Sequence, residues 1–106
     1  MKKHVFAICA YKDSPYLEAC IRSLKQQTVP ANIILCTSTP SSYIEMLAES
    51  WDIPVFVRNG PSDIRDDWEF AYHMADGDLV TIAHQDDMYH RRYKEILLAR
   101  AGKYPD

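Results

Sequence analysis

The sequence has no long hydrophobic run, and we expect it to carry no signal for export. None of its apolar stretches approaches the roughly 20 residues that a membrane-spanning helix needs. The apolar stretch Val5–Ala10 follows two lysines, but it is too short for a secretory signal and no cleavage site follows it. We therefore predict a cytoplasmic protein without a membrane span.

An excess of positive charge is also missing. The chain has 12 lysines and arginines against 15 aspartates and glutamates, which gives a formal net charge of −3. A chain with this balance has no electrostatic reason to bind nucleic acid or an anionic membrane surface. We therefore expect neither partner.

Cysteine is sparse, and its pattern argues against two common roles. The three cysteines, Cys9, Cys20 and Cys36, lie far apart and form no CxxC pair. An odd number argues against a disulfide framework, and the wide spacing argues against a metal-binding or redox motif. Each cysteine lies within an apolar run, so we predict thiols buried in the core.

The composition that remains is that of one ordinary globular domain. Hydrophobic residues make up 47% of the chain and charged residues 25%, which is typical of folded domains. A chain of 106 residues is large enough for a core but near the small end for an α/β sheet. We therefore predict a single domain over residues 1–106.

Short buried strands alternate with helices along the chain. Residues 4–10 are nearly all apolar, as in a central parallel strand that is covered on both faces. Ser14 and Pro15 then suit a helix start, and the helix is expected to end near Gln27. The remaining predicted elements are strands over 33–36, 54–57 and 79–83, and helices that start at Thr39, Asp63 and Met88.

Each of the first three predicted helices carries one apolar stripe at helical spacing. The stripes are Leu17, Cys20, Ile21 and Leu24 in the first helix, Ile44, Leu47, Ala48 and Trp51 in the second, and Ile64, Trp68, Ala71 and Ala75 in the third. We expect these side chains to face the sheet, and Gly77 to end the third helix.

The alternation predicts the fold class. It favours an α/β fold with an open, Rossmann-like parallel sheet of about four strands and helices on both faces, in a three-layer αβα arrangement. The first strand is the most apolar, so we place it centrally and predict the strand order 3-2-1-4. The topological switch point, where the strand order reverses, would then lie between the first and fourth strands, which brings the loop at Tyr11 beside the loop at His84.

The stretch Leu79–Tyr93 carries the side chains best suited to chemistry, because its strand is followed at once by His84-Gln85-Asp86-Asp87. Open α/β sheets bind ligands at the carboxyl ends of their strands. One carboxylate together with substrate phosphate oxygens is a common way of holding Mg²⁺ or Mn²⁺. The alternative is that one of the two aspartates only caps the following helix. The spacing alone leaves both interpretations open.

Several motifs occur in an order that resembles a known family. Tyr11-Lys12-Asp13 follows the first strand, Gln26-Gln27-Thr28 ends the first helix, and Ala75-Asp76-Gly77-Asp78 precedes the strand that leads to Gln85-Asp86-Asp87. Over nearly the whole chain this order resembles the amino-terminal, nucleotide-binding half of family-two glycosyltransferases with the GT-A fold. The resemblance implies a nucleotide-diphospho-sugar donor and a divalent cation, Mn²⁺ or Mg²⁺.

In that family the corresponding strand ends in an Asp-x-Asp motif whose last acid binds the metal. The matching residues are His84, Gln85 and Asp86, so the resemblance implies that Asp86 holds the cation, with Asp87 beside it. His84 departs from the pattern, because the family's first acid faces the ribose or the nucleotide. The imidazole of His84 either replaces that contact or is structural.

The resemblance also implies a set of nucleotide-binding residues: Tyr11, Thr37, Ser38, Arg65, His84 and Gln85. Tyr11 matches the residue that lines the base pocket, where an aromatic ring can stack on a pyrimidine. Thr37 and Ser38 stand where the family often carries an acid that recognises uracil, so the sequence does not determine which nucleobase is bound. Arg65 could reach a phosphate, and the alternative is an exposed arginine without a ligand.

The implied function is transfer of a sugar to an acceptor hydroxyl, with metal-assisted departure of the nucleoside diphosphate. The acceptor is unknown and no catalytic residue is assigned, because the family's catalytic carboxylate lies further along the chain. Two alternatives remain: a non-catalytic nucleotide-binding module and a metal-dependent phosphohydrolase. We therefore expect an incomplete glycosyltransferase domain that binds the donor without transferring sugar. The exposed edge of the strand over 79–83 favours a homo-oligomer.

Overall fold

Strand β1 (His4–Ala10) forms the centre of the sheet, as its apolar sequence predicts. A computed structural model describes residues 3–103 of the chain, and their side chains through residue 100. β1 pairs in parallel with β2 (Asn32–Thr37) on one side and β4 (Leu79–His84) on the other, and β3 (Val55–Val57) pairs with β2. The strand order is β3-β2-β1-β4, which confirms the prediction.

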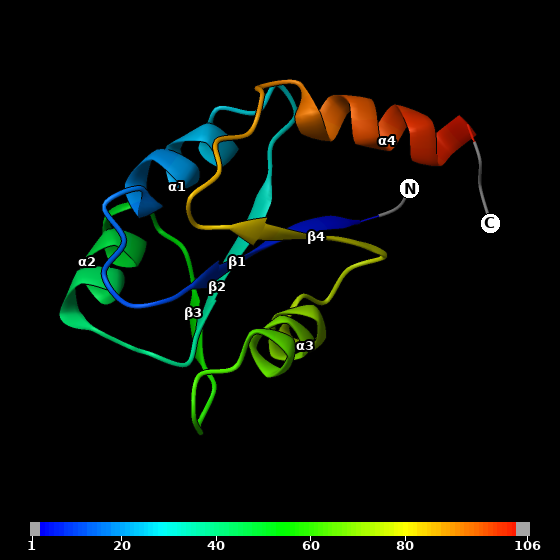
Figure 1. Cartoon of the computed structure of the whole chain (residues 1–106). Coiled ribbons are helices and arrows are strands. Elements are labelled where there is room, and N and C mark those ends of the chain that lie inside the picture. Colours follow the sequence, from blue (N-terminus) through cyan, green and yellow to red (C-terminus); the bar gives the residue numbers. More distant parts are fainter. Residues whose placement is uncertain (1–2, 104–106) are drawn as a thin grey trace.

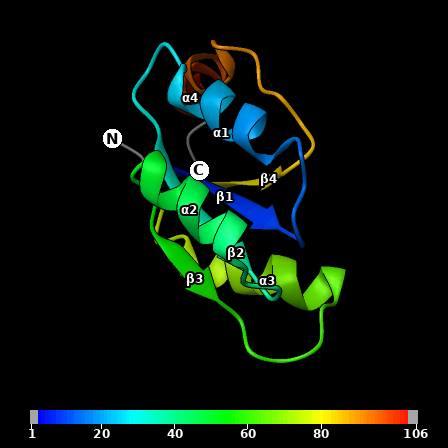
Figure 2. The same cartoon turned by 90° about the vertical axis from the view of Figure 1, so that its left-hand side faces the viewer.

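Helices cover both faces of this sheet. α1 (Leu17–Lys25), α2 (Ser42–Ser50) and α4 (Tyr93–Lys103) lie over one face, and α3 (Ile64–Met74) lies over the other (Figure 1 and Figure 2). This arrangement confirms the predicted α/β fold class. Within residues 3–103 there is no helix with the length and apolar character needed to cross a membrane.

Alternate residues of β1 supply two separate parts of the core. Phe6 and Ile8 pack with the residues of α1 and α2, whereas Val5 and Ala7 pack with those of α3. None of these four side chains is more than 3% exposed. Both faces of β1 are therefore buried, which explains why its sequence shows no alternation of polar and apolar residues.

The apolar stripe predicted for α1 is confirmed, because all four of its side chains are fully buried. The predicted starts of α1 and α2 are wrong. The residue that precedes α1 is Tyr16, which makes no side-chain capping bond, and the N-cap of α2 is Ser41 rather than Thr39. Ser14 and Thr39 instead form hydrogen bonds between loops at the site described below.

Helix α3 begins where predicted but leaves its first turns uncovered. Asp63 caps it by accepting a backbone N–H at 3.1 Å, which confirms the predicted cap. Ala71 and Ala75 are buried, but Ile64 is 72% exposed and Trp68 is 42% exposed. The predicted burial of these two side chains is wrong because they line a cavity beyond the strand ends.

Gly77 does not end α3, which stops at Met74. A Cβ atom at Gly77 would lie 2.9 Å from Cγ2 of Val5 and 3.1 Å from the carbonyl oxygen of Lys3. Those distances are shorter than van der Waals contact. Glycine therefore allows the chain to pass close to β1 before it enters β4.

The last helix begins at Tyr93 rather than at Met88, the predicted start. The residues between β4 and α4 form a loop that is bonded to the end of α1. The buried side chain of Gln27 donates to the carbonyls of Ser23 at 3.1 Å and His90 at 2.8 Å, and it accepts the backbone N–H of Lys94 at 2.8 Å. These bonds hold the loop that follows the polar end of β4.

Candidate functional site

A cavity of about 480 Å³ opens at the carboxyl ends of β1 and β4. Cys9 lies beside His84 in the register of these two strands, and the chain leaves the sheet just after each of them. The lining residues are Cys9, Ala10, Tyr11, Cys36, Ser62, Asp63, Ile64, Asp67, Trp68, His84, Gln85 and Asp86. This β1/β4 cavity lies at the point between the first and fourth strands where the sequence predicts a ligand site.

The loop after β1 has a strained backbone that polar contacts hold in place. Lys12 has a φ of 55°, a left-handed conformation that costs a residue with a side chain about 1 kcal/mol or more. Its backbone N–H donates to Oγ1 of Thr39 at 2.6 Å, and Oγ of Ser41 donates to Oδ1 of Asp13 at 2.7 Å. These contacts from the loop before α2 stabilise the conformation that exposes Tyr11 at the cavity.

Asp86 projects from the turn after β4, with one carboxylate oxygen already bonded. Oγ of the buried Ser14 donates to Oδ1 of Asp86 at 3.0 Å and accepts the backbone N–H of Tyr16 at 3.2 Å. Among the described residues, no side chain or backbone group donates to Oδ2 of Asp86. One oxygen of this exposed carboxylate is therefore oriented, and the other is open to a ligand.

The donor set at this turn fits a cation that is only partly held by protein. No three His, Cys, Asp or Glu side chains within residues 3–103 converge as a metal site. Mg²⁺ does not require such a cage, since it is usually bound by one or two carboxylates together with waters and substrate phosphates. Asp86, with its open oxygen, meets that requirement.

The lining of the cavity is acidic. It contains Asp63, Asp67 and Asp86 and no lysine or arginine. The carboxylate of Asp67 is compensated, because Oδ1 accepts from Nε of Arg58 at 2.8 Å and Oδ2 accepts from Oγ of Ser38 at 3.1 Å. The other two carboxylates have no ion pair within the described residues. A diphosphate entering here would be repelled unless a cation bound with it.

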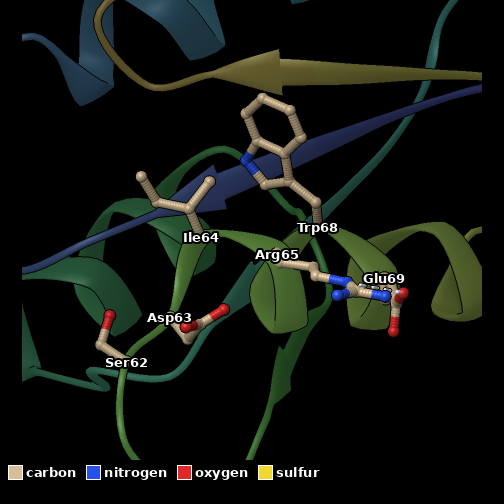
Figure 3. Close-up of a pocket in the computed structure, with 6 residues that line it drawn as sticks. All are labelled: Ser62, Asp63, Ile64, Arg65, Trp68 and Glu69. Carbon is tan, nitrogen blue, oxygen red and sulfur yellow. Dashed lines mark ion pairs between the residues drawn. The ribbon is translucent and has the colours of Figure 1, made fainter.

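Helix α3 supplies an apolar wall opposite the strand ends. Figure 3 shows Ile64 and Trp68 pointing toward the strands, whereas Arg65 and Glu69 point away from them. The ring of Trp68 lies 5.1 Å from that of His84, centroid to centroid. A second, shallow hollow of about 730 Å³ shares Ser62, Asp63, Ile64 and Trp68 with the β1/β4 cavity, and Arg65 lines only this hollow.

The two thiols in the cavity lining are protonated at neutral pH. Cys9 and Cys36 are neighbours in the register of β1 and β2. Burial raises the pKa of Cys9 to about 11, with a smaller contribution from the charge of Asp67. Burial likewise raises the pKa of Cys36 to about 12. Because the thiolate is the reactive form, neither residue is suited to act as a nucleophile.

The structure brings together four of the residues that the sequence singled out. Tyr11, His84, Gln85 and Asp86 all line the β1/β4 cavity. Gln85 uses its amide within the protein: Oε1 accepts the backbone N–H of Tyr11 and Nε2 donates to the carbonyl oxygen of Tyr11, both at 3.0 Å.

The other four predicted residues lie outside the lining. Thr37 is buried and its Oγ1 accepts a backbone N–H at 2.9 Å, and Ser38 reaches the cavity only through its bond to Asp67. Arg65 is exposed and lies 3.7 Å from its partner carboxylate on the next turn of α3. Asp87 is exposed, and its backbone N–H donates to the carbonyl of His84 at 3.1 Å.

Sequence reasoning missed the residues that support the site from neighbouring loops. Ser14 and Thr39 resemble helix caps in sequence, and nothing in their local pattern indicates bonds to residues far along the chain. Arg58 and Asp67 carry no spacing signal for an ion pair. The exposed position of Trp68 was missed because its spacing in α3 matches a buried stripe.

Comparisons with known proteins place this arrangement in a family. The chain matches the model of glycosyl transferase family 2 over residues 5–106. A search of curated protein sequences finds no significant match.

Solved structures share the fold at low sequence identity. TarS of S. aureus is 15% identical with a TM-score of 0.79, over 95% of this chain and 20% of that one. The mannosyltransferase PcManGT from Pyrobaculum calidifontis, solved with GDP-Man and Mn²⁺, is 17% identical with a TM-score of 0.71, over 99% of this chain and 33% of that one. A CMP:2-keto-3-deoxy-manno-octonic acid synthetase in complex with CTP is 20% identical with a TM-score of 0.73, over 97% of this chain and 48% of that one.

This chain spans less than half the length of each of these three structures. At such identities the likeness establishes the α/β fold, and the family follows from the model match over nearly the whole sequence. The family resemblance noted in the sequence is therefore confirmed, and the chain belongs to glycosyl transferase family 2.

Proposed function

We propose that residues 1–106 form the donor-binding part of a glycosyltransferase, which holds the nucleoside diphosphate of a nucleotide sugar together with a divalent cation in the β1/β4 cavity. One observation carries the proposal: Tyr11 and Asp86, from loops at the carboxyl ends of two adjacent strands, line the same acidic cavity in a chain of this family. PcManGT, which shares the fold, was solved with GDP-Man and Mn²⁺, and this supports the same class of ligand here.

Asp86 is the residue that would hold the cation, and Ser14 would orient it. When bound, the cation would compensate the charge that develops on the nucleoside diphosphate as it leaves the sugar. Ser14 donates to Oδ1 of Asp86, which would leave Oδ2 for the ligand. Ile64 and Trp68 would shield one side of the site from water, because they are the apolar part of its wall.

Tyr11 is the residue best placed to contact the nucleobase. Tyr11 is 46% exposed beside the cavity, and an exposed aromatic face is suited to stacking. Ser38 donates its hydroxyl hydrogen to Asp67, so toward a base it would act as an acceptor. Thr37, which is buried, would contribute by shaping the loop that carries Ser38. Arg65 would contact the donor only after leaving Glu69.

Calorimetric titration of UDP and of GDP in the presence of Mn²⁺ tests the proposal. We expect one nucleotide to bind with one site per chain, Asp86→Ala to abolish that binding, and Asp87→Ala to weaken it only slightly. Equal losses in the two variants would contradict the assignment of Asp86. No binding of either nucleotide would contradict the proposed function.

A turnover assay separates the alternatives that share this site. Incubation with UDP- and GDP-sugars and simple acceptors measures transfer, and free phosphate is measured in parallel. Metal-dependent release of phosphate from the nucleotide would indicate a phosphohydrolase instead. The cytoplasmic location stays a prediction.

A further inference from the structure

We infer that Gln85 is a positioning residue, which holds the backbone of Tyr11 and thereby fixes the base-binding ring relative to Asp86. The inference rests on the proposed function. Its basis is a pair of hydrogen bonds between residues 74 positions apart: Tyr11 N–H donates to Oε1 of Gln85, and Nε2 of Gln85 donates to the carbonyl oxygen of Tyr11, both at 3.0 Å. The orientation of the amide follows from these partners, because a backbone N–H can only donate and a carbonyl can only accept.

This amide pair continues the sheet beyond the point where the strands separate. The register of β1 and β4 ends with Cys9 beside His84. One residue beyond the end of β4, the side chain of Gln85 takes the place of a peptide group and bonds to both backbone groups of Tyr11. The loop therefore has a partner at a position where no strand remains to supply one.

The loop needs such a partner because its conformation is strained. Lys12, the next residue, has a φ of 55°, which few side-chain-bearing residues adopt without support. Thr39 holds the loop from the β2 side by accepting the N–H of Lys12. Gln85 holds it from the β4 side. Without the Gln85 amide, the backbone N–H and carbonyl of Tyr11 would both lose their hydrogen-bond partner.

The amide pair sets the distance between Tyr11 and Asp86, the two residues proposed to contact opposite ends of the ligand. Gln85 lies between His84 and Asp86, so the same turn that carries the proposed metal ligand also fixes Tyr11. A nucleoside diphosphate must contact both ends at once, and a site that holds them at a fixed separation binds it with a smaller loss of conformational entropy. The role assigned here is therefore indirect: Gln85 acts on the nucleotide through Tyr11 rather than by touching it.

A double-mutant cycle tests this role with the whole chain and UDP or GDP plus Mn²⁺ as the probe. Gln85→Leu keeps the size of the side chain and removes both bonds, and we expect it to weaken nucleotide binding about tenfold, as the loss of two neutral hydrogen bonds allows. Gln85→Glu keeps an acceptor for the Tyr11 N–H but cannot donate to the Tyr11 carbonyl, and its charge adds to the acidic lining, so it should bind nucleotide no better than Gln85→Leu. Tyr11→Ala and the double variant Tyr11→Ala/Gln85→Leu should bind equally weakly, because Gln85 has nothing to position once the ring is gone.

Additive losses in the double variant would overturn the inference, since they would mean that Gln85 contacts the ligand directly. Unchanged binding in Gln85→Leu would overturn it as well. A second readout needs no nucleotide: hydrogen exchange of the Tyr11 amide should accelerate in Gln85→Leu and stay slow in Glu45→Gln, a surface control on α2. If the wild-type chain binds neither nucleotide, the proposed function fails. The exchange measurement then still tests whether Gln85 holds Tyr11, and equal exchange in the two variants would refute it.

Discussion

The hydroxyl of Ser14 joins the start of the first helix to the proposed metal ligand. It donates to Asp86 at 3.0 Å and accepts a hydrogen bond from the N–H of Tyr16 at 3.2 Å, so the hydroxyl serves as both donor and acceptor. Hydrogen bonds of this kind orient metal-binding carboxylates and often affect metal affinity strongly. The sequence shows only a serine before a proline, which fits a helix cap equally well, and this is why its partner could not be predicted.

Substitution of Ser14 should therefore act on metal-dependent binding. We expect Ser14→Ala to weaken binding of the nucleotide with Mn²⁺ about tenfold, and Ser14→Thr, which keeps a hydroxyl, to retain most of it. Calorimetric titration at matched Mn²⁺ concentration gives the comparison, with Ser50→Ala on α2 as the control. If the alanine and threonine variants bind equally well, the hydroxyl does not orient Asp86.

His4 gives a second prediction at the residue scale, this time on stability. It is 1% exposed, its Nε2 lies 2.8 Å from Oγ1 of Thr81, and within the described residues its Nδ1 has no partner. Burial, with a smaller contribution from the charge of Lys94, lowers its pKa from 6.5 to about 4. The folded protein therefore holds His4 neutral over a pH range in which the unfolded chain protonates it.

Stability should fall as the pH falls from about 6.5 to about 4. In that window His4 is protonated in the unfolded state but neutral in the folded state. Its contribution lowers the free energy of unfolding by about 2–3 kcal/mol. Urea unfolding across the window, compared with His4→Gln, measures the contribution. An identical pH slope in the variant would show that His4 is not responsible.

For helices and strands, the sequence predicts which face is buried better than it predicts where the element begins or ends. The stripe of α1 and the unbroken apolar sequence of β1 follow from hydrophobic period alone, and both are confirmed. Helix starts depend on the partners of polar side chains, which come from distant parts of the chain. The spacing of Ile64 and Trp68 matches a buried face, but between these side chains and the strand ends lies the β1/β4 cavity, which leaves both exposed.

Gln27, which follows α1, bonds both to the loop between β4 and α4, at His90, and to the first turn of α4, at Lys94. We expect Gln27→Leu to lower the free energy of unfolding by about 2–3 kcal/mol, since it removes three hydrogen bonds of a buried side chain and leaves their partners unpaired. Urea unfolding gives the change in stability, and amide exchange at Lys94 reports on the loop. Gln26→Leu at the exposed neighbouring residue is the control, and equal effects of the two substitutions would refute this role for Gln27.

Within the described residues the sheet has two edge strands, β3 and β4, and β4 is the longer of the two. β4 pairs with β1 on one side only, and its sequence, LVTIAH, contains none of the lysine or proline residues that usually protect an edge. The site lies at the end of the same strand. The strand order and the position of the cavity were both predictable from topology, because the most apolar strand takes the centre and its loop meets that of the fourth strand.

We expect copies of the chain to associate through this edge. Pairing of β4 with a second β4 would satisfy its unpaired backbone groups and cover Leu79, Val80 and Ile82, which are only half-buried. Sedimentation equilibrium should show a monomer–dimer equilibrium, and exchange of β4 amides should slow as the protein concentration rises. A monomer at every concentration, with β4 amides that exchange at a constant rate, would contradict this expectation.

Paramagnetic broadening of amide resonances shows whether a nucleoside diphosphate and a divalent cation bind together at the carboxyl ends of β1 and β4. Mn²⁺ in the presence of the nucleotide that binds should broaden the signals of Ser14, Gln85, Asp86 and Asp87 most strongly, with Mg²⁺ as the diamagnetic reference. We expect Asp86→Ala to remove this pattern. Broadening centred on Asp76 and Asp78 at the opposite end of β4, or a pattern that persists in Asp86→Ala, would contradict it.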